Sequence, residues 1–204
     1  MNNFNLIAPV YDRLARLVFG DALINAQMHY YGVLKDGDEV LIVGGGTGHV
    51  LKVLDQLSIP LYVTYLDKSE KMINLSKSRA PFQNIEVKYF HAELNTIGHI
   101  HFDVVLVAFF LDVFNQENLV KVINRLNQLL KKEGALLVTD FVNTSKGWHK
   151  LLIGFMYLFF RLTTRLEGNR LLDFEFYLKR RGFIKDTCRS FFHGLIESAI
   201  YRKE

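Results

Sequence analysis

The chain has 204 residues, half of them hydrophobic, and its 25 Lys and Arg against 21 Asp and Glu give a net charge of +4. A chain of this length can bury about 70% of its unfolded surface around one core, so we expect a single domain, 1–204. The basic residues form no run of five or more, which argues against a nucleic-acid partner. The single cysteine, Cys188, excludes an internal disulfide, and the first residues do not resemble a signal peptide, so we expect a cytoplasmic protein.

Two helices are predicted over residues 4–34, divided near Gly20 and Asp21, and we expect residues 1–36 to cover the site. Between Asp38 and Asp140, short apolar runs alternate with longer segments of helical period, which is typical of a parallel sheet with helices on both faces. The predicted strands are Glu39 to Val43, Leu61 to Leu66, Ile85 to Tyr89, Asp103 to Ala108 and Gly134 to Asp140. The predicted helices between them are Val50 to Leu57, Ser69 to Arg79 with Ser69 as N-cap, and Gln116 to Lys131.

The last third of the chain has a different pattern. We expect a helical insertion over the substrate side at residues 142–182, with helices from about Trp148 to Arg165 and from Arg170 to Arg181. Two extended runs follow, Phe183 to Phe192 and Leu195 to Arg202. The link between these runs is only two residues long, too short for a parallel crossover, so they are predicted to form an antiparallel hairpin.

An apolar and aromatic stretch opens this insertion. Its uncharged run, Leu151 to Phe160, has ten residues, whereas a membrane-spanning helix needs about 20. The aromatic side chains would suit an apolar acceptor, and burial against the domain's own helices is an alternative. Basic residues flank the run, so residues 148–165 also predict a membrane-surface contact or a homodimer interface.

Residues 40 to 49, VLIVGGGTGH, lead from an apolar strand into a glycine loop. Glycines let the backbone approach a ligand closely, and amides at the following helix start can face it. The dinucleotide fingerprint needs a third small residue where this chain has His49. The alternative frame is Gly44, Gly46 and Gly48. Asp67, after the second strand, could accept both ribose hydroxyls of either NAD or S-adenosylmethionine.

Further motifs follow the loop in order: YLDKSEKMI, KYFHAE, FDVVLVAFFLDVF and LLKKEGALLVTDF, with IAPVYDRLA before it. Together they make nearly the whole chain resemble a class I S-adenosylmethionine-dependent methyltransferase of the small-molecule type, similar to quinone-biosynthesis methyltransferases. The resemblance implies an α/β, Rossmann-like fold with a seven-stranded, mostly parallel sheet, an antiparallel last strand and helices on both faces. It also implies transfer of the methyl group of S-adenosylmethionine to a small, apolar acceptor.

The resemblance assigns roles to residues at matching positions. The methionine portion of the cofactor would lie against Gly44, Gly46, Thr47 and Gly48, and the ribose against Asp67. The adenine would meet Lys68, His91 and Ala92, whereas Ala108 and Phe109 would lie beneath the methionine and the sulfonium. Tyr11 would be a lid residue that contacts cofactor or substrate.

Three positions depart from the family pattern. Ile42 stands where the family usually carries an acid that braces the loop and the cofactor's ammonium group. Lys68 replaces an apolar residue that packs on adenine, and His91 replaces an aspartate that bonds the adenine amine.

Two candidate catalytic residues emerge, Asp112 and Tyr11. Asp112 lies among phenylalanines, so its pKa could be raised and it could act as a general base, with a helix cap as the alternative. His49 is a weaker candidate because a histidine at a helix start is often a solvated surface residue. His99 and His101 alternate on an extended segment but lack a third ligand, so no metal is expected.

Two other functions remain open at this point. A cofactor-binding module that has lost catalysis is favoured by Ile42, and an NAD-dependent oxidoreductase is disfavoured by His49 and the terminal hairpin. A nucleic-acid methyltransferase is disfavoured because no N-P-P-Y-type tetrapeptide follows the fourth strand.

Overall fold

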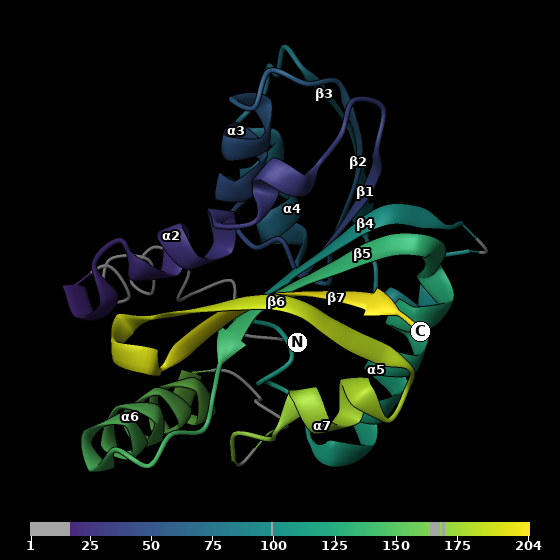
Figure 1. Cartoon of the computed structure of the whole chain (residues 1–204). Helices are drawn as coiled ribbons and strands as arrows, with labels where there is room; N and C mark the ends of the chain where they lie inside the picture. The colour runs from purple at the N-terminus through teal and green to yellow at the C-terminus, as the bar shows by residue number, and fades with distance from the viewer. Residues whose placement is uncertain (1–16, 99, 164–167, 169) are drawn as a thin grey trace.

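A computed structural model describes residues 17–98, 100–163, 168 and 170–204 of the chain (Figure 1). Its strands are β1 (Glu39–Val43), β2 (Leu61–Asp67), β3 (Ile85–His91), β4 (Phe102–Ala108), β5 (Leu130–Phe141), β6 (Phe183–Phe191) and β7 (Ile196–Lys203). Its α-helices are α2 (Ala22–Met28), α3 (His49–Asp55), α4 (Glu70–Lys77), α5 (Gln116–Leu129), α6 (Gly147–Thr163) and α7 (Phe174–Lys179). Short 3-10 helices lie at Tyr31–Val33, Leu94–Thr96 and Phe192–Gly194.

The described strands form one seven-stranded sheet in the order β3-β2-β1-β4-β5-β7-β6. The strands β1 to β5 are parallel to one another, and β7 runs antiparallel to both β5 and β6. The predicted mostly parallel sheet and the terminal hairpin are therefore confirmed. The strand order reverses between β1 and β4, and ligands of such sheets bind at the carboxyl ends of the strands beside this switch point.

Helices cover both faces of the sheet, as predicted. Leu41 and Val43 of β1 belong to the core beneath α5 and α7, whereas Val40 and Ile42 belong to the core beneath α3 and α4. This alternation follows from the period of two in a strand, and both sets are apolar because both faces are buried. Figure 1 shows α3 and α4 on one side of the sheet and α5 and α7 on the other.

Two predicted helix boundaries and one strand start are wrong by a few residues, the strand start because β5 begins at Leu130 and not at Gly134. The helix expected to reach Lys131 ends at Leu129, because Leu130 already has extended dihedral angles and pairs with Phe102. Regular pairing of β5 with β4 resumes at Ala135, close to the predicted strand start. The helix expected from Arg170 begins at Phe174, where the side chain of Asp173 accepts a hydrogen bond from the amide of Phe176.

Other boundaries agree with the patterns that predicted them. Ser69 caps α4 by accepting a hydrogen bond from the amide of Met72 at 3.3 Å. The N-terminal helices divide at a turn over Gly20 and Asp21, as expected, although most of the first predicted helix and Tyr11 lie outside the described residues. Among the described helices, none is long and apolar enough to cross a membrane.

Candidate functional site

The glycine loop connects the carboxyl end of β1 to α3, as the sequence predicts. Gly44, Gly46 and Gly48 have φ angles of 64°, 61° and 76°. These are left-handed conformations that cost a residue with a side chain roughly 1–2 kcal/mol, and glycine adopts them without that cost. The backbone of the loop thus depends on glycine at the three positions of the predicted frame.

The neighbours of the glycines differ from one position to the next. A Cβ atom at Gly44 would lie 2.6 Å from the ring of Phe110, and one at Gly48 would lie 2.5 Å from Cβ of Ser76. A Cβ atom at Gly45 would meet the ring of Tyr65 at 2.3 Å, whereas Gly46 has open space within 4 Å. Three of these glycines therefore allow close packing inside the protein, and Gly46 is the one with room beside it for a ligand.

Side chains from β2 and from the residues just after α4 hold the loop in place. The hydroxyl of Tyr65 donates a hydrogen bond to the carbonyl of Gly46 at 2.8 Å, and the amide of Gly46 donates to Oδ2 of Asp67 at 2.9 Å. Nε of Arg79 donates to the carbonyl of Thr47 at 2.5 Å. These partners brace the loop from β2 and from the residues just after α4, while the side chain of Ile42 is buried in the core beneath α3 and α4.

Sequence reasoning missed both Tyr65 and Arg79 as loop contacts. A signal for Tyr65 was available, because it lies two residues before Asp67 and the period of two in a strand puts both on one face. Arg79 follows α4 and is 32 residues from Thr47, so no local pattern indicates its contact.

Asp67 is 9% exposed at the carboxyl end of β2. Oδ1 accepts a hydrogen bond from the amide of Ser69 at 2.8 Å, and Oδ2 accepts the one from Gly46. Burial raises the pKa of this carboxyl, and the two amide hydrogen bonds act against that rise. A carboxylate oxygen can accept two hydrogen bonds, so each oxygen of Asp67 can still accept one from a ligand hydroxyl.

The residues predicted near the adenine lie next to Asp67. His91 is the register partner of Asp67 on β3, and its Nε2 lies 3.1 Å from the carbonyl of Lys68. The amide of Ala92 donates to the carbonyl of Asp67 at 3.2 Å. The side chains of Lys68 and His91 are exposed, and Ala92 is half-buried.

The end of β4 lies on the other side of the switch point. Ala108 and Phe109 are half-buried there, and the amide of Phe109 donates to the carbonyl of Thr139 at 2.8 Å. Phe109 has a φ of 50°, which is uncommon for a residue with a large side chain. Such strain is concentrated at functional sites because the surrounding contacts must hold it.

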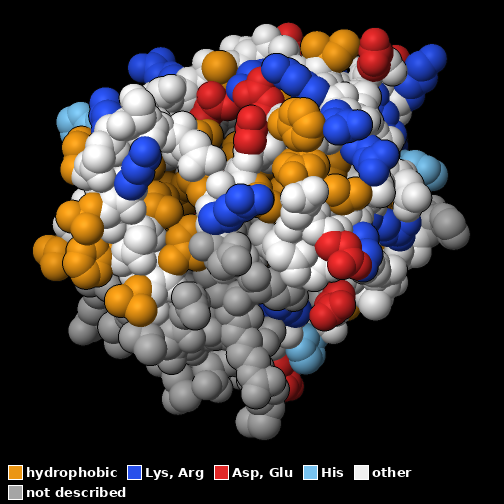
Figure 2. Space-filling model, turned by 90° about the horizontal axis from the view of Figure 1, so that it is seen from below, with side chains coloured by type: hydrophobic (Ala, Val, Ile, Leu, Met, Phe, Trp, Pro, Cys, Tyr) orange, Lys and Arg blue, Asp and Glu red, His pale blue; other side chains and the backbone are white. Residues whose placement is uncertain are grey.

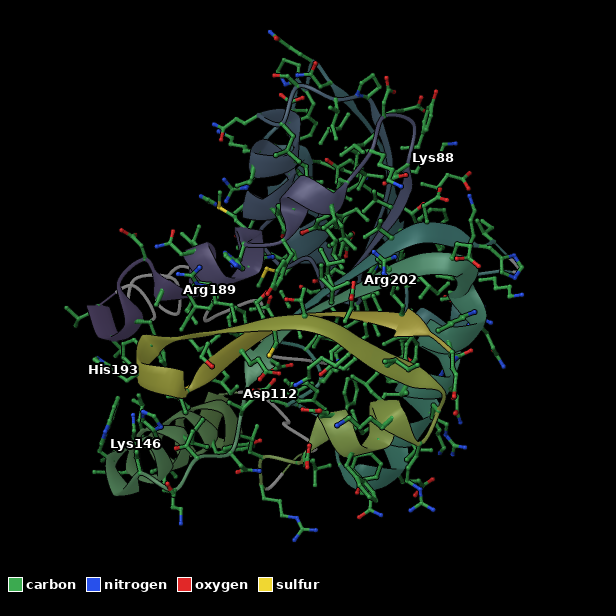
Figure 3. The ribbon with its side chains drawn as sticks, in the orientation of Figure 1. Lys88, Asp112, Lys146, Arg189, His193 and Arg202 are labelled. Atoms are coloured by element: carbon green, nitrogen blue, oxygen red, sulfur yellow. The ribbon has the colours of Figure 1, made fainter. Side chains whose placement is uncertain are left out.

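Asp112, three residues beyond Phe109, has a carboxyl oxygen that is buried. Its Oδ1 has no hydrogen-bond partner among the residues that the structure describes. Burial raises the pKa of Asp112 well above the ordinary value, and the nearby Asp140 raises it further. In Figure 3 Asp112 lies between α6 and the strands of the terminal hairpin.

Asp140 holds the loop that carries Asp112. It is fully buried near the end of β5, and its Oδ2 accepts hydrogen bonds from the amides of Phe110 at 3.2 Å and Leu111 at 2.8 Å. Burial raises the pKa of Asp140 to about 6, although its backbone hydrogen bonds oppose the shift. Sequence reasoning assigned no role to Asp140. Its position as an acid at the end of the fifth predicted strand was the signal that could have indicated one.

A helix of the insertion also contacts this loop. The hydroxyl of Tyr157 on α6 donates to the carbonyl of Asp112 at 2.9 Å, and the amide of Gly168 donates to the carbonyl of Val113 at 2.9 Å. The insertion therefore lies against the loop after β4.

The parallel sheet brings all the described candidate residues to one edge. The glycine loop, Asp67, Lys68, His91 and Ala92 lie at the ends of β1, β2 and β3, and Ala108, Phe109 and Asp112 lie at or after the end of β4. Open space beside Gly46 and free acceptor capacity on Asp67 fit a ligand that carries ribose hydroxyls. The buried Oδ1 of Asp112 lies at this edge without a hydrogen-bond partner among the described residues.

Comparisons with known proteins agree with this arrangement. Residues 40–134 match the model of a methyltransferase domain family. The chain is 30% identical to a demethylmenaquinone methyltransferase of Leptospira interrogans, over 98% of this chain and 91% of that protein. It is 24% identical to a ubiquinone/menaquinone biosynthesis C-methyltransferase of Campylobacter jejuni, over 71% of this chain and 64% of that protein.

Solved structures have the same fold at lower identity. A methyltransferase of calicheamicin biosynthesis with S-adenosylhomocysteine bound is 20% identical with a TM-score of 0.69, and the match covers 96% of this chain and 56% of that one. The 1,6-didemethyltoxoflavin-N1-methyltransferase of Burkholderia thailandensis is 14% identical with a TM-score of 0.68, and the match covers 98% of this chain and 86% of that one.

Proposed function

We propose which residues of this chain bind the cofactor and which molecule accepts the methyl group. The premise is that the chain belongs to the class I S-adenosylmethionine-dependent methyltransferases and acts on a small molecule. Bound S-adenosylmethionine supplies a methyl group on a sulfonium. We assign the methionine portion to Gly44, Gly46, Thr47 and Gly48, the ribose to Asp67, the adenine to Lys68, His91 and Ala92, and the sulfonium to Ala108 and Phe109. Gly46 and Asp67 carry this assignment, since they combine open space with free acceptor capacity.

The acceptor in our proposal is an apolar molecule with an ionisable aromatic ring, such as a hydroquinone. The name of the Leptospira relative, demethylmenaquinone methyltransferase, supports this class of acceptor. The loop after β4 supports it as well, because the rings of Phe110 and Phe114 pack edge to face with centroids 5.0 Å apart beside Asp112. Tyr11 keeps its predicted role as a lid residue.

Asp112 is the proposed general base. The observation that carries this role is its buried Oδ1, which has no hydrogen-bond partner in the described part of the chain. When a hydroquinone takes up a methyl group from a sulfonium, the ring must lose one proton. A carboxylate with a raised pKa can accept that proton near neutral pH, because its basicity then matches the task. Asp140 acts through the backbone of Phe110 and Leu111, so we assign it a positioning role.

An activity assay tests the proposal. The purified chain is incubated with S-adenosylmethionine and a panel of reduced prenylated naphthoquinones, phenols and amines, and methylated product is detected by mass spectrometry. We expect turnover of the naphthohydroquinones and a loss of about 10²–10⁴ in kcat/KM for Asp112→Asn. The control is Asp186→Asn, because the exposed Asp186 pairs with Arg202 on the hairpin.

Each result separates two hypotheses. Full activity of Asp112→Asn would contradict the general base, and turnover of phenols or amines alone would contradict the hydroquinone. Binding of S-adenosylmethionine in calorimetry without turnover of any acceptor would favour the inactive cofactor-binding module. The kcat/KM of the native protein should rise with pH through the raised pKa of Asp112, since only the ionised carboxylate accepts a proton.

Two expectations stay predictions. The cytoplasmic location rests on the single cysteine and on the N-terminal sequence. The contact through residues 148–165, with either a membrane surface or a second copy of the chain, involves α6 and the residues after it.

A further inference from the structure

The helix α6 has two apolar faces, and only one of them is packed. Leu152, Ile153 and Met156 are half-buried against a core that includes Phe141 and Leu195. Another face carries large hydrophobic side chains that are exposed to solvent: Trp148 is 46% exposed, Leu151 64%, Phe155 61% and Leu158 53%.

The exposed side chains form one stripe along the helix. They are spaced three and four residues apart, which places them on the same side of an α-helix. Figure 2 shows hydrophobic side chains gathered on the left of the face seen from below, where α6 lies in Figure 1. Contiguous exposed apolar surface of this kind marks a site of interaction, whereas single exposed hydrophobic residues do not.

Basic residues flank the stripe in the sequence. Between Asp140 and Glu167 the chain has no acidic residue, and its basic residues there are Lys146, Lys150, Arg161 and Arg165. The side chain of Lys146 lies next to the hairpin tip, where its Nζ donates to the carbonyl of His193 at 2.7 Å. Figure 3 shows Lys146 and His193 at the same end of the molecule.

The aromatic residue at the start of the stripe suits a lipid interface. The ring of Trp148 lies edge to face with Phe192 and His193 of the hairpin tip, at centroid distances of 6.0 and 5.8 Å. Tryptophan is enriched where hydrocarbon meets headgroups, and Leu and Phe with flanking Lys and Arg are typical of helices that lie in this interface.

We propose that α6 docks this protein on the surface of a bilayer that contains anionic phospholipids. The helix lies parallel to the membrane, with Trp148, Leu151, Phe155 and Leu158 inserted among the acyl chains and the basic residues at the headgroups. A second copy of the chain is a poorer occupant, because two such surfaces would bring like charges together. The proposal rests on exposed side chains and charge, so it holds whatever the acceptor proves to be.

Docking through α6 would also set the position of the site. Tyr157 lies on the same helix and its hydroxyl donates to the carbonyl of Asp112, so the helix that would insert also contacts the loop of the proposed base. An apolar acceptor dissolved in the bilayer would then reach the loop after β4 without passing through water.

The fluorescence of Trp148 tests the docking directly, because it is the only tryptophan of the chain. The full chain is titrated with vesicles of phosphatidylcholine alone or with 30% phosphatidylglycerol, about 0.3 mole fraction of negative charge, a composition rich enough to attract basic residues. We expect a shift of the emission to shorter wavelength, quenching by lipids brominated in the acyl chain, and at least tenfold tighter binding to the anionic vesicles. No shift and no co-sedimentation with anionic vesicles would overturn the proposal.

Two matched double variants test whether the exposed face of α6 is the surface that binds the vesicles. Leu151→Ser with Phe155→Ser should weaken vesicle binding at least tenfold, whereas Tyr62→Ser with Ile184→Ser removes two residues that are each 54% exposed on β2 and β6 and should leave it unchanged. Far-ultraviolet circular dichroism and S-adenosylhomocysteine binding verify that both variants fold. Equal loss in the two variants would overturn the proposal, as would a lipid-free dimer in analytical ultracentrifugation that only the first variant dissociates.

Discussion

The two sides of the ligand edge differ in how their buried carboxyl groups are satisfied. At the end of β2, both oxygens of Asp67 accept backbone amides, and Tyr65 and Arg79 hold the neighbouring loop. After β4, the Oδ1 of Asp112 is buried without a partner among the described residues, and the charge of the nearby Asp140 raises its pKa further. Buried polar groups are normally paired. The glycine loop with Asp67, Tyr65 and Arg79 is therefore a rigid structure, which we call the cradle. The loop after β4 instead keeps one carboxylate acceptor free for chemistry.

The rigid side should break first when its packing is disturbed. In Gly45→Ala the new methyl group would lie 2.3 Å from the fully buried ring of Tyr65. We therefore expect the free energy of unfolding to fall by about 2–3 kcal/mol. Urea denaturation measures this loss. Gly147→Ala is the control, because a Cβ atom there meets nothing within 4 Å and the change should stay within about 0.5 kcal/mol. Equal stability of the two variants would mean that the cradle can shift to admit a side chain.

Removing the carboxylate of the cradle should cost affinity. Asp67→Ala should weaken the binding of S-adenosylhomocysteine more than tenfold, or about 1.4 kcal/mol, because the ribose loses its acceptor and the amides of Gly46 and Ser69 lose theirs. Calorimetric titration measures the affinity, with Asp186→Ala as the remote control. An unchanged affinity would mean that the ribose is held elsewhere.

The other side should gain stability when its carboxyl is neutralised. The pKa of Asp112 is raised in the folded protein, so ionising it costs folding free energy, and that cost grows as pH rises from the unfolded pKa through the folded one. Asp112→Asn should therefore be more stable than the native protein at pH 8. The difference should vanish at about pH 2–3, below the unfolded pKa of about 3.9, where both the folded and the unfolded states are protonated.

Thermal or urea unfolding of the two proteins over this pH range makes the measurement. Comparing them cancels the contribution of carboxyl groups remote from Asp112, such as that of Glu117, whose pKa is lowered by Lys121. Asp140 interacts with Asp112, so its change belongs to the measured difference. A constant difference over the whole range would show that the buried charge of Asp112 is compensated.

The smallest effect concerns a single hydrogen bond of the cradle. Tyr65→Phe leaves the carbonyl of Gly46 without its donor, so we expect a loss of about 1 kcal/mol in the free energy of unfolding and weaker cofactor binding. Tyr89→Phe is the matched control, because the hydroxyl of Tyr89 is 3.4 Å from the carbonyl of Ser76 and less buried. A larger effect in Tyr89→Phe would contradict the role of Tyr65 as a brace.

Much of the fold could be predicted from local patterns. The near-continuous apolar runs located the core of each strand, and the two residues His193 and Gly194 indicated the antiparallel hairpin. The errors lie where tertiary contacts override local preference: Leu130 reads as the end of a helix, but pairing with Phe102 makes it extended.

The candidate site was predicted less completely. The frame of Gly44, Gly46 and Gly48 matches the three left-handed positions, because only glycine takes that conformation at no steric cost. The residues that brace the loop were not predicted, since Arg79 and Asp140 act over 32 and 29 to 30 residues of chain.

The sequence by itself determined the order of the elements, the glycine frame and the resemblance to the methyltransferases, because backbone conformation and hydrophobic period are written in neighbouring residues. Tertiary structure decided that Gly45 must fit Tyr65, that Asp67 is satisfied while Asp112 is not, and that one apolar face of α6 stays exposed. These features depend on which side chains from distant segments are in contact, and strand register and helix packing determine those contacts.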